Sequence, residues 1–325
     1  HITDLLRGYT MAKIDFAHKA QRKMFEAILD SVIKHSNSDR TKAIKQLVDL
    51  VKKTMYDIWG SATYEMFGFS SKSDSKWMKY IDNLLNDVHP NIIKGKALNT
   101  AYEAGYRGFR IAQDMKKKHD INIPWIILVD PTSACNLKCT GCWSAEYGHL
   151  IQLSYEELDR IITEGEELGI YAWLMTGGEP LIRKADILKL AEAHPYSSFH
   201  IFTNGTLIDD AFCEEVVRLG NIAPSISLEG FEEVNDLRRG NGVFQKVMHA
   251  MDTMKKHKLL FGTSICYTNS NYKTVTSDEF LDMIISKGVK YTWYFHYMPV
   301  GNDASTDLLL TPEQREYMYH RVREI

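Results

Sequence analysis

From about residue 121 the chain alternates between short apolar runs and amphipathic stretches, and this alternation limits the fold more than any other feature. The apolar runs predict strands at 125–129, 171–175, 199–202, 223–228, 259–267 and 289–297. The stretches between them predict helices at 154–168, 184–194, 209–219, 243–257 and 277–287. Ser154 and Glu157 form a capping box at the start of the first of these helices. Strand–helix units with right-handed crossovers build a parallel sheet covered by helices. The sequence therefore predicts an α/β fold, a partial (β/α)6 TIM-like barrel, with a doubly wound sheet as the alternative.

The first 120 residues show helical periodicity and no convincing strand. Apolar residues share a helix face in two stretches: Phe25, Ile28, Leu29 and Val32, then Ile44, Leu47, Val48, Val51 and Met55. Because 325 residues are enough for two domains, we expect an all-helical domain at 1–120 and the barrel at 121–325. These stripes are expected to pack in a core. The alternative is a lid, a partner surface or a lipid-binding surface, to which an aromatic cluster would contribute: Trp59, Tyr64, Phe67 and Phe69.

Three of the five cysteines stand in the run Cys135-Asn-Leu-Lys-Cys139-Thr-Gly-Cys142, on a loop after the first predicted strand. Thiolates are the usual ligands of a [4Fe–4S] cluster. Three of them hold three irons and leave the fourth open to a small molecule. Zinc usually takes four ligands, in separated pairs, and a redox dithiol needs only CxxC, which leaves Cys135 unexplained. The spacing favours an iron–sulfur site, with zinc or structural thiols as the alternative.

The composition limits the setting of such a site. With 44% hydrophobic and 25% charged residues, the chain is an ordinary globular protein. Its net charge of −3 does not indicate a nucleic-acid partner, and no apolar run approaches the ~20 residues that a membrane span needs. Exposed thiol ligands are better suited to a reducing cytoplasm than to a secreted setting, so we expect a cytoplasmic protein.

Glycine-rich motifs follow the second and third predicted strands. In barrels of this type, the loops after the strands carry the chemistry. Gly177 and Gly178 in the segment TGGEP let the backbone approach a ligand closely, and Glu179 adds a carboxylate that can accept a bond from a ligand ammonium. The segment TNG at 203–205 follows the third strand. Taken singly, both motifs are also typical of plain turns.

Polar and apolar side chains follow the later strands. Ser227 and Glu229 lie on one face of a strand end, a good arrangement for paired sugar hydroxyls. Arg238 and Arg239 supply a guanidinium for a ligand carboxylate, with a surface charge pair as the alternative. The segment YFHYMPVG at 294–301 offers apolar groups that can pack against a flat ring.

In this order, the segments CNLKCTGC, TGGEP, TNG, SISLEG, RRGNGVF and YMPVG resemble those of the radical S-adenosylmethionine (SAM) superfamily. The resemblance covers about residues 121–325, and the combination is specific although most of its pieces are weak alone. It implies a partial TIM barrel that binds a [4Fe–4S] cluster and SAM. In this family an electron from the reduced cluster cleaves SAM to methionine and a 5′-deoxyadenosyl radical, which takes hydrogen from an unactivated C–H bond. The protein orients the cofactors and excludes side reactions.

The resemblance also assigns residues to the two cofactors. The cluster would be bound by Cys135, Cys139 and Cys142. SAM would be bound at its ammonium by Gly177, Gly178 and Glu179, at its ribose by Ser227 and Glu229, at its carboxylate by Arg239, and at its adenine by the residues from Met298 to Val300. No residue is assigned to hydrogen abstraction. One position departs from the family pattern, which often has an aromatic residue just before the last cysteine. This chain has Gly141 there, and Trp143 just beyond Cys142.

Together these inferences predict a radical SAM enzyme that abstracts hydrogen from an organic substrate, either a lipid or a small metabolite. We expect it to need a reducing electron donor such as flavodoxin or ferredoxin. The sequence predicts no transmembrane segment and is compatible with peripheral lipid contact. A lipid substrate predicts a deep apolar cavity between the helical domain and the barrel. The alternatives are a peptide-modifying maturase whose C-terminal extension lies outside this sequence, or a non-catalytic iron–sulfur or zinc-binding protein.

The two remaining cysteines cannot build a second cluster alone. We expect Cys213 to be a buried helix residue and Cys266 a strand residue, rather than ligands. His296 and Tyr297 near the end of the last strand are expected in the core or at its rim, with substrate contact as the alternative.

Overall fold

The computed structural model describes residues 16–34, 42, 44, 49, 75–144, 150–300 and 304–325. Four residues of the second predicted apolar stripe lie outside the described residues: Leu47, Val48, Val51 and Met55. So do the aromatic cluster at 59–69 and Gly301 of the last motif.

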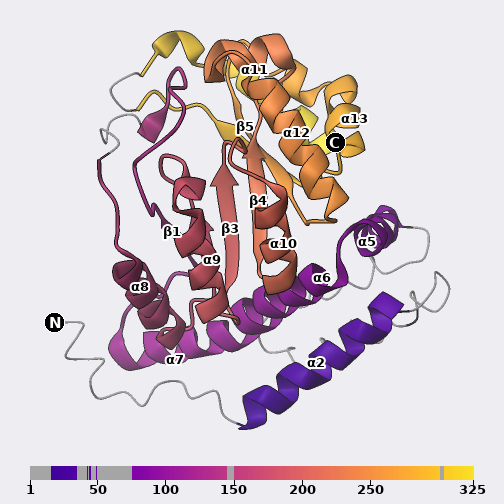
Figure 1. Cartoon of the computed structure of the whole chain (residues 1–325), viewed down its shortest axis with the longest axis vertical. Helices are drawn as coiled ribbons and strands as arrows, with labels where there is room; N and C mark the ends of the chain where they lie inside the picture. Colours follow the sequence, from indigo (N-terminus) through magenta and orange to yellow (C-terminus); the bar gives the residue numbers. More distant parts are fainter. Residues whose placement is uncertain are drawn as a thin grey trace.

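Six parallel strands form one curled sheet, and each pairs with its neighbour in chain order (Figure 1). The strands are β1 (Ile126–Val129), β2 (Ala172–Met175), β3 (Ser198–Thr203), β4 (Ile222–Ser227), β5 (Gly262–Tyr267) and β6 (Thr292–His296). A doubly wound sheet would reverse its strand order at a switch point, and this sheet does not. The predicted partial (β/α)6 barrel is therefore confirmed, and all six strands lie within three residues of their predicted bounds.

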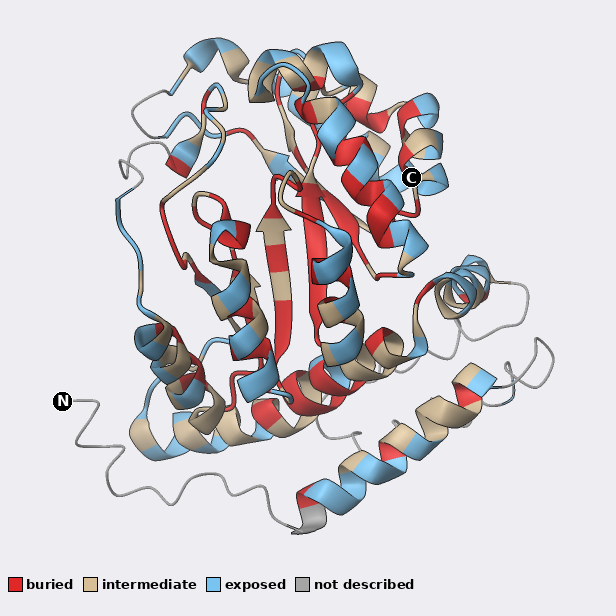
Figure 2. Ribbon diagram, in the orientation of Figure 1, coloured by how far each residue is buried: buried red, intermediate tan, exposed pale blue. Residues whose placement is uncertain are grey.

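Helices cover the outer face of the sheet. The crossover helices are α8 (Tyr155–Glu167), α9 (Lys184–Ala193), α10 (Asp210–Leu219), α12 (Val243–Lys256) and α13 (Asp278–Ser286). All five were predicted, and the capping box of Ser154 and Glu157 opens α8. Short turns η3 (Pro180–Arg183), η4 (Thr274–Thr276) and η5 (Thr306–Leu308) and the last helix α14 (Pro312–Glu324) complete this part. Figure 2 shows the buried strands and the alternation of buried and exposed faces along the covering helices.

One further helix, α11 (Glu232–Arg239), was not predicted. Its sequence EEVNDLRR carries only two apolar residues, so it has no helical stripe to recognise. Leu237, one of those two, is 82% exposed. This helix carries the two arginines of the RRG motif at its carboxyl end.

Side chains of the strands alternate between the helix-covered face and the concave face. Trp173, Phe199 and Ile201 point to the helices and are fully buried in the main core. Their neighbours point the other way and line the concave side, which we call the lumen. Its larger members are Leu128, Leu174, His200, Phe202, Trp293 and Phe295.

The amino-terminal helices lie beneath the sheet, at the amino-terminal ends of its strands (Figure 1). They are α2 (Phe16–Lys34), α5 (Lys76–Asp87), α6 (Pro90–Ala97), the π-helical η1 (Leu98–Gly108) and α7 (Phe109–His119). The amide of Asn99 donates to Pro195 O and Ser197 O, both at 2.9 Å, just before β3. Trp125, just before β1, donates to Ala104 O at 3.3 Å. This helical layer is therefore the floor of the half-barrel.

A buried ionic cluster holds α2 to this floor. The carboxylate of Glu103 is fully buried and lies 2.9 Å from His18, 2.6 Å from Arg22 and 3.7 Å from Arg107. Phe25 of the predicted apolar stripe is buried beside Leu98 and Tyr102. The division at residue 120 stays a prediction, and many contacts cross it. No helix in the described part of the chain is long and apolar enough to span a bilayer.

Candidate active site at the carboxyl ends of the strands

The three cysteines of the CxxxCxxC run lie on the loop that leaves β1. Cys135, Cys139 and Cys142 are all partly exposed and free of disulfides. Burial raises the pKa of the Cys135 thiol, and the other two thiols add to the shift. Burial also raises the pKa of Cys139, against the effect of the Arg239 guanidinium. The three sulfurs therefore lie near one another.

The Gly-Gly-Glu loop after β2 pairs directly with the chain that enters the cysteine loop. Gly178 N–H donates to Thr132 O at 3.0 Å, and Glu179 N–H donates to Ala134 O at 2.8 Å. A Cβ on Gly178 would lie 2.2 Å from Ala134 O, a distance that a real side chain cannot occupy. Glycine is required here because two backbones approach closely.

Glu179 is buried and uses both carboxylate oxygens inside the protein. Oε1 accepts from Leu181 N–H at 2.9 Å and from the Thr203 hydroxyl at 2.7 Å, and Oε2 accepts from Asn204 N–H at 2.7 Å. Burial raises the pKa of Glu179, and these three donors act in the opposite direction. The carboxylate thus joins the loop after β2 to the TNG turn after β3.

A side-chain relay continues this connection back to the cysteine loop. The amide of Asn204 donates to Asn136 Oδ1 at 2.8 Å, and the amide of Asn136 donates to the Thr206 hydroxyl at 2.8 Å. The sequence indicated Asn204 only as part of the TNG segment, and it did not indicate Asn136 or Thr206 as its partners. The only local signal was that Asn136 directly follows Cys135, and its partners lie about 70 positions away.

Glu229 is the second fully buried carboxylate at the carboxyl ends of the strands, a region that we call the mouth. Its Oε1 accepts from Arg238 Nη1 at 2.7 Å and from Arg239 Nε at 3.0 Å, and its Oε2 accepts from Cys266 N–H at 3.1 Å. Arg239 Nη1 lies 3.9 Å from Cys139 Sγ. The loop residue Thr140 donates its N–H to Arg238 O at 2.9 Å. The end of α11 is therefore bound both to β4 and to the cysteine loop.

The remaining predicted contacts lie around this centre. Ser227 is half-buried at the end of β4, and Met298 and Val300 after β6 are 64% and 49% exposed. The structure thus joins the cysteine loop to Gly178 and Glu179 by backbone bonds, and to Arg239, the partner of Glu229, through Cys139. Met298 and Val300 after β6 remain exposed to solvent at the edge of this group.

The family departure at Gly141 has a steric explanation. Gly141 has a φ of +66°, and a Cβ there would lie 2.9 Å from the Tyr297 hydroxyl oxygen. Tyr297 is 2% exposed and its hydroxyl accepts Ser305 N–H at 3.0 Å. Its ring fills the space beside Gly141, so an aromatic side chain at position 141 would collide with it. Tyr297 therefore has the core role that the sequence favoured.

The two other cysteines also follow the sequence expectation. Cys213 is fully buried on α10, and Cys266 is a residue of β5. The structure adds that Cys266 faces the lumen in register with Phe295. Burial raises the pKa of its thiol to about 11.

The donor set at the mouth fits an iron–sulfur cluster better than a single zinc ion. Within the part of the chain that the structure describes, no three His, Cys, Asp or Glu side chains converge on one metal position. A closed zinc site would bring four ligands to about 2.0–2.3 Å from one point. Three thiols on one loop, with guanidinium groups beside them, match the ligands and the charge of a thiolate-bound cluster.

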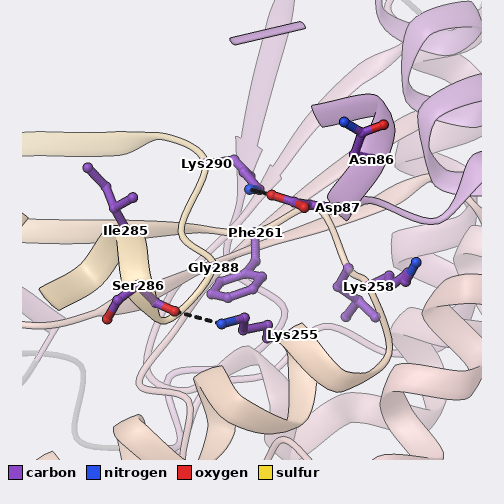
Figure 3. Close-up of a pocket in the computed structure, with 10 residues that line it drawn as sticks. Asn86, Asp87, Lys255, Lys258, Phe261, Ile285, Ser286, Gly288 and Lys290 are labelled. Atoms are coloured by element: carbon purple, nitrogen blue, oxygen red, sulfur yellow. Dashed lines mark hydrogen bonds and ion pairs between the residues drawn. The ribbon is translucent and has the colours of Figure 1, made fainter. Parts of the chain in front are cut away.

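A pocket of about 460 Å³ lies elsewhere, near the amino-terminal ends of β5 and β6 (Figure 3). The ends of α5, α12 and α13 meet there, and Lys290 pairs with Asp87. Lys255 donates to Ser286 O at 2.8 Å. Lysines at helix carboxyl ends offset the helix dipoles, so this pocket is explained by the packing of helix ends.

Comparison with known proteins agrees with this geometry. Residues 129–285 match the family model described as the Radical SAM superfamily. The chain is 30% identical over 202 residues to GTP 3′,8-cyclase of Thermodesulfovibrio yellowstonii, covering 58% of this chain and 61% of that one. It is 26% identical over 186 residues to Fe-coproporphyrin III synthase of Methanosarcina barkeri, covering 55% and 45%. The chain spans about half the length of the curated relatives it matches.

Solved structures share the fold. The structure of anSMEcpe with bound AdoMet and a peptide matches with a TM-score of 0.52 at 22% identity, over 61% of this chain and 58% of that one. SuiB of Streptococcus suis matches with a TM-score of 0.57 at 16% identity, over 92% and 61%. The superfamily uses SAM and an iron–sulfur cluster, for which the mouth offers thiols and glycine backbone. With its half-barrel, its cysteine loop and the family model that matches residues 129–285, this chain carries a radical SAM domain.

Proposed function

We propose that this protein reductively cleaves SAM at a [4Fe–4S] cluster to a 5′-deoxyadenosyl radical that takes hydrogen from an organic substrate. The observation that carries the proposal is the backbone pairing of the Gly-Gly-Glu loop with Thr132 and Ala134, directly before Cys135. This pairing sets the start of the cysteine loop beside the glycine backbone at 177–178. A cluster and a ligand ammonium can therefore be bound side by side.

The residues of the mouth would divide this work. The thiolates of Cys135, Cys139 and Cys142 would hold the cluster. The backbone at Gly177 and Gly178 would meet the ammonium of SAM. Its remaining contacts would come from Ser227 at the ribose, from Arg239 at the carboxylate, and from Met298 and Val300 at the adenine.

Glu179 and Glu229 act as positioning residues in this proposal, although the family resemblance assigns them to SAM itself. Every oxygen of the two carboxylates already accepts a bond from the chain. Glu229 engages Arg239 through Nε and Nη2 and leaves Nη1 directed at Cys139. It therefore aims the guanidinium at the cluster loop.

The substrate proposed is a lipid or a small metabolite, and the reductant is a donor such as flavodoxin or ferredoxin in a reducing cytoplasm. Peptide modification is the second candidate. It is favoured by relatives named as maturases, among them the sulfatase-maturating enzyme of Clostridium perfringens, 29% identical over 171 residues and 46% of this chain. It is also favoured by the structural likeness to SuiB, which has been solved with a precursor peptide.

The experiment is anaerobic reconstitution with iron and sulfide, followed by reduction with dithionite and measurement of 5′-deoxyadenosine. The wild type should form a cluster and cleave SAM. Cys139→Ala should lose both, whereas the matched control Cys213→Ala, in the core of α10, should retain both. A reconstituted cluster that never cleaves SAM would leave only a non-catalytic iron–sulfur protein.

A further inference from the structure

We propose that the floor of the lumen binds the carboxylate end of an elongated apolar substrate, with Lys96 as the anion-binding group. This inference rests on the proposed function, which puts the reacting end of the substrate at the mouth. It adds a substrate class to the site: a molecule with an apolar body and one terminal negative charge.

Lys96 enters the lumen from below. It lies on α6, and its ammonium donates to the Ser198 hydroxyl and to Phe199 O at 3.2 Å, at the first residues of β3. Ser198 shares its strand face with the lumen residues His200 and Phe202. The Ser198 hydroxyl also lies 3.1 Å from that of Thr100, an exposed residue. The floor is therefore polar, with Ser198 buried, Lys96 partly exposed and Thr100 exposed.

No carboxylate among the described residues forms an ion pair with Lys96. Lys94, two positions earlier on the same helix, pairs with Glu26 at 3.5 Å and with Asp30 at 3.2 Å. Burial lowers the pKa of Lys96 to about 7. Lys96 is partly buried and has hydrogen-bond acceptors but no counter-charge. A charge shielded from water without a counter-charge opposes folding. A bound anion would supply the missing partner.

The walls above the floor are apolar and partly open. Trp293 and Phe295 of β6 are each 42% exposed, and Leu128 of β1, on the opposite edge of the sheet, is 55% exposed. Phe202 lies edge-on to both rings, with centroids 6.0 Å and 5.6 Å apart. Large apolar side chains on a concave face, above a single ammonium, match an apolar chain or ring system that ends in an anion.

The charge of the floor selects a monoanion. His200 is the other basic group next to Lys96, and burial together with Lys96 lowers its pKa to about 3. It is therefore a neutral imidazole at physiological pH, within 2.8 Å of the Ser225 hydroxyl. One ammonium balances one carboxylate, whereas a dianionic phosphate would be left half neutralised.

The length of the lumen limits the length of the substrate. Five steps along β3, from Ser198 to Thr203, span about 16 Å at ~3.3 Å per residue. Thr203 contacts Glu179 at the mouth. A substrate anchored at Lys96 must therefore extend roughly 16 Å to bring a C–H bond to the cysteine loop.

The test uses the reconstituted holoenzyme with SAM and two amphiphiles of equal tail length, dodecanoate and dodecyltrimethylammonium, below their micellar concentrations. Binding is measured by anaerobic calorimetry. Dodecanoate should bind more tightly than the cation. Lys96→Met should weaken dodecanoate binding about tenfold or more, because one charge-assisted bond is lost, and should not weaken binding of the cation. The matched control is Lys94→Met, which should bind dodecanoate like the wild type.

A second variant covers the case in which Lys96→Met fails to fold. Thr100→Glu places a carboxylate beside Lys96 at an exposed position and should block dodecanoate. The proposal is overturned if the wild type binds both amphiphiles equally or binds no dodecanoate, or if Lys94→Met weakens binding as much as Lys96→Met. Formation of 5′-deoxyadenosine by the wild type is assayed separately. Its absence would reject the proposed chemistry and leave the binding result standing.

Discussion

Glu179 and Glu229 connect the motifs of the mouth at the scale of single residues. Each carboxylate accepts hydrogen bonds from segments far apart in the chain, and neither is accessible to solvent. Buried acceptors with every oxygen satisfied are rigid, because losing one bond leaves a donor unpaired in a site of low polarity. The two residues therefore fix the loops that are proposed to bind the cofactors.

We predict that Glu179→Gln destabilises the apoprotein by about 1–3 kcal/mol, because an amide NH₂ must face either Asn204 N–H or the donors at Oε1. The affinity for SAM should also fall. Urea unfolding and calorimetry measure the two effects. Glu192→Gln, at an exposed position on α9, is the control and should change neither.

Gly178→Ala should move the Gly-Gly-Glu loop away from the cysteine loop, since the new methyl group would lie 2.2 Å from Ala134 O. We expect a loss of more than about 2 kcal/mol and a lower iron content after reconstitution. Gly242→Ala meets no atom within 4 Å and carries only the strain of its φ of +76°. It should cost about 1–2 kcal/mol and keep the iron. Equal iron loss in both variants would contradict the steric explanation.

His200 should make the protein less stable in acid. Its pKa is lowered to about 3 in the folded state, whereas the unfolded chain takes up this proton near pH 6.5. The unfolded state therefore binds more protons between these values, and stability falls as the pH drops through this window. His200→Gln should show a shallower loss of stability between pH 6 and pH 4 in urea titrations. A parallel pH profile for the two proteins would show that the imidazole is not buried as described.

At the scale of elements, the contact between α2 and η1 depends on one buried carboxylate. The side chain of Glu103 has no exposed surface, and its carboxylate pairs with His18, Arg22 and Arg107. Apolar packing adds to it through Phe25 and Tyr102, whose ring centroids lie 5.2 Å apart. Because a buried cation without its partner is costly, this cluster is decisive for the docking of α2.

We predict that Glu103→Ala removes about 3–5 kcal/mol from the docking of α2, because it leaves buried guanidinium groups without a counter-charge. Hydrogen exchange should rise across α2 and stay low in the strands. Glu26→Ala, which removes a partly exposed partner of Lys94, is the control and should leave the exchange of α2 nearly unchanged. Uniform exchange across the whole chain would show that α2 is not a separate unit.

At the scale of the whole molecule, the helical layer and the cysteine mouth lie at opposite ends of the strands. Asn99 and Trp125 bind the floor to the starts of β3 and β1, and Lys290 with Asp87 does the same beside β6. Gly108 and Gly169 pack with their backbones in close contact. The described helices therefore close the barrel from below, at the end away from the cysteines.

This arrangement predicts that residues 121–325 alone do not fold cooperatively, because the starts of the strands would lose their buried cover. A chain from residue 75 to 325, which keeps the floor helices α5, α6, η1 and α7, should melt in one transition by circular dichroism. A cooperative transition in the shorter chain would instead support an independent barrel domain.

The sequence alone determined the elements and predicted the cluster ligands. Periodicity and cysteine spacing are local properties, so strands, crossover helices and the CxxxCxxC loop can be read from neighbouring residues. Helix α11 was missed because its eight residues have no apolar stripe. The TNG turn and the Gly-Gly-Glu loop were recognised, but their direct connection through Glu179 was not.

Only the tertiary structure decided which groups face one another at the mouth and on the floor. Arg239 reaches Cys139 across 100 positions of the chain, and Lys96 reaches Ser198 across 102. Tyr297 fills the space beside Gly141. The curvature of the sheet and the packing of the helices determine these contacts, and both depend on the packing of the whole core. Spacing within one segment therefore predicts a ligand set, whereas the charge and shape that surround it follow from the complete fold.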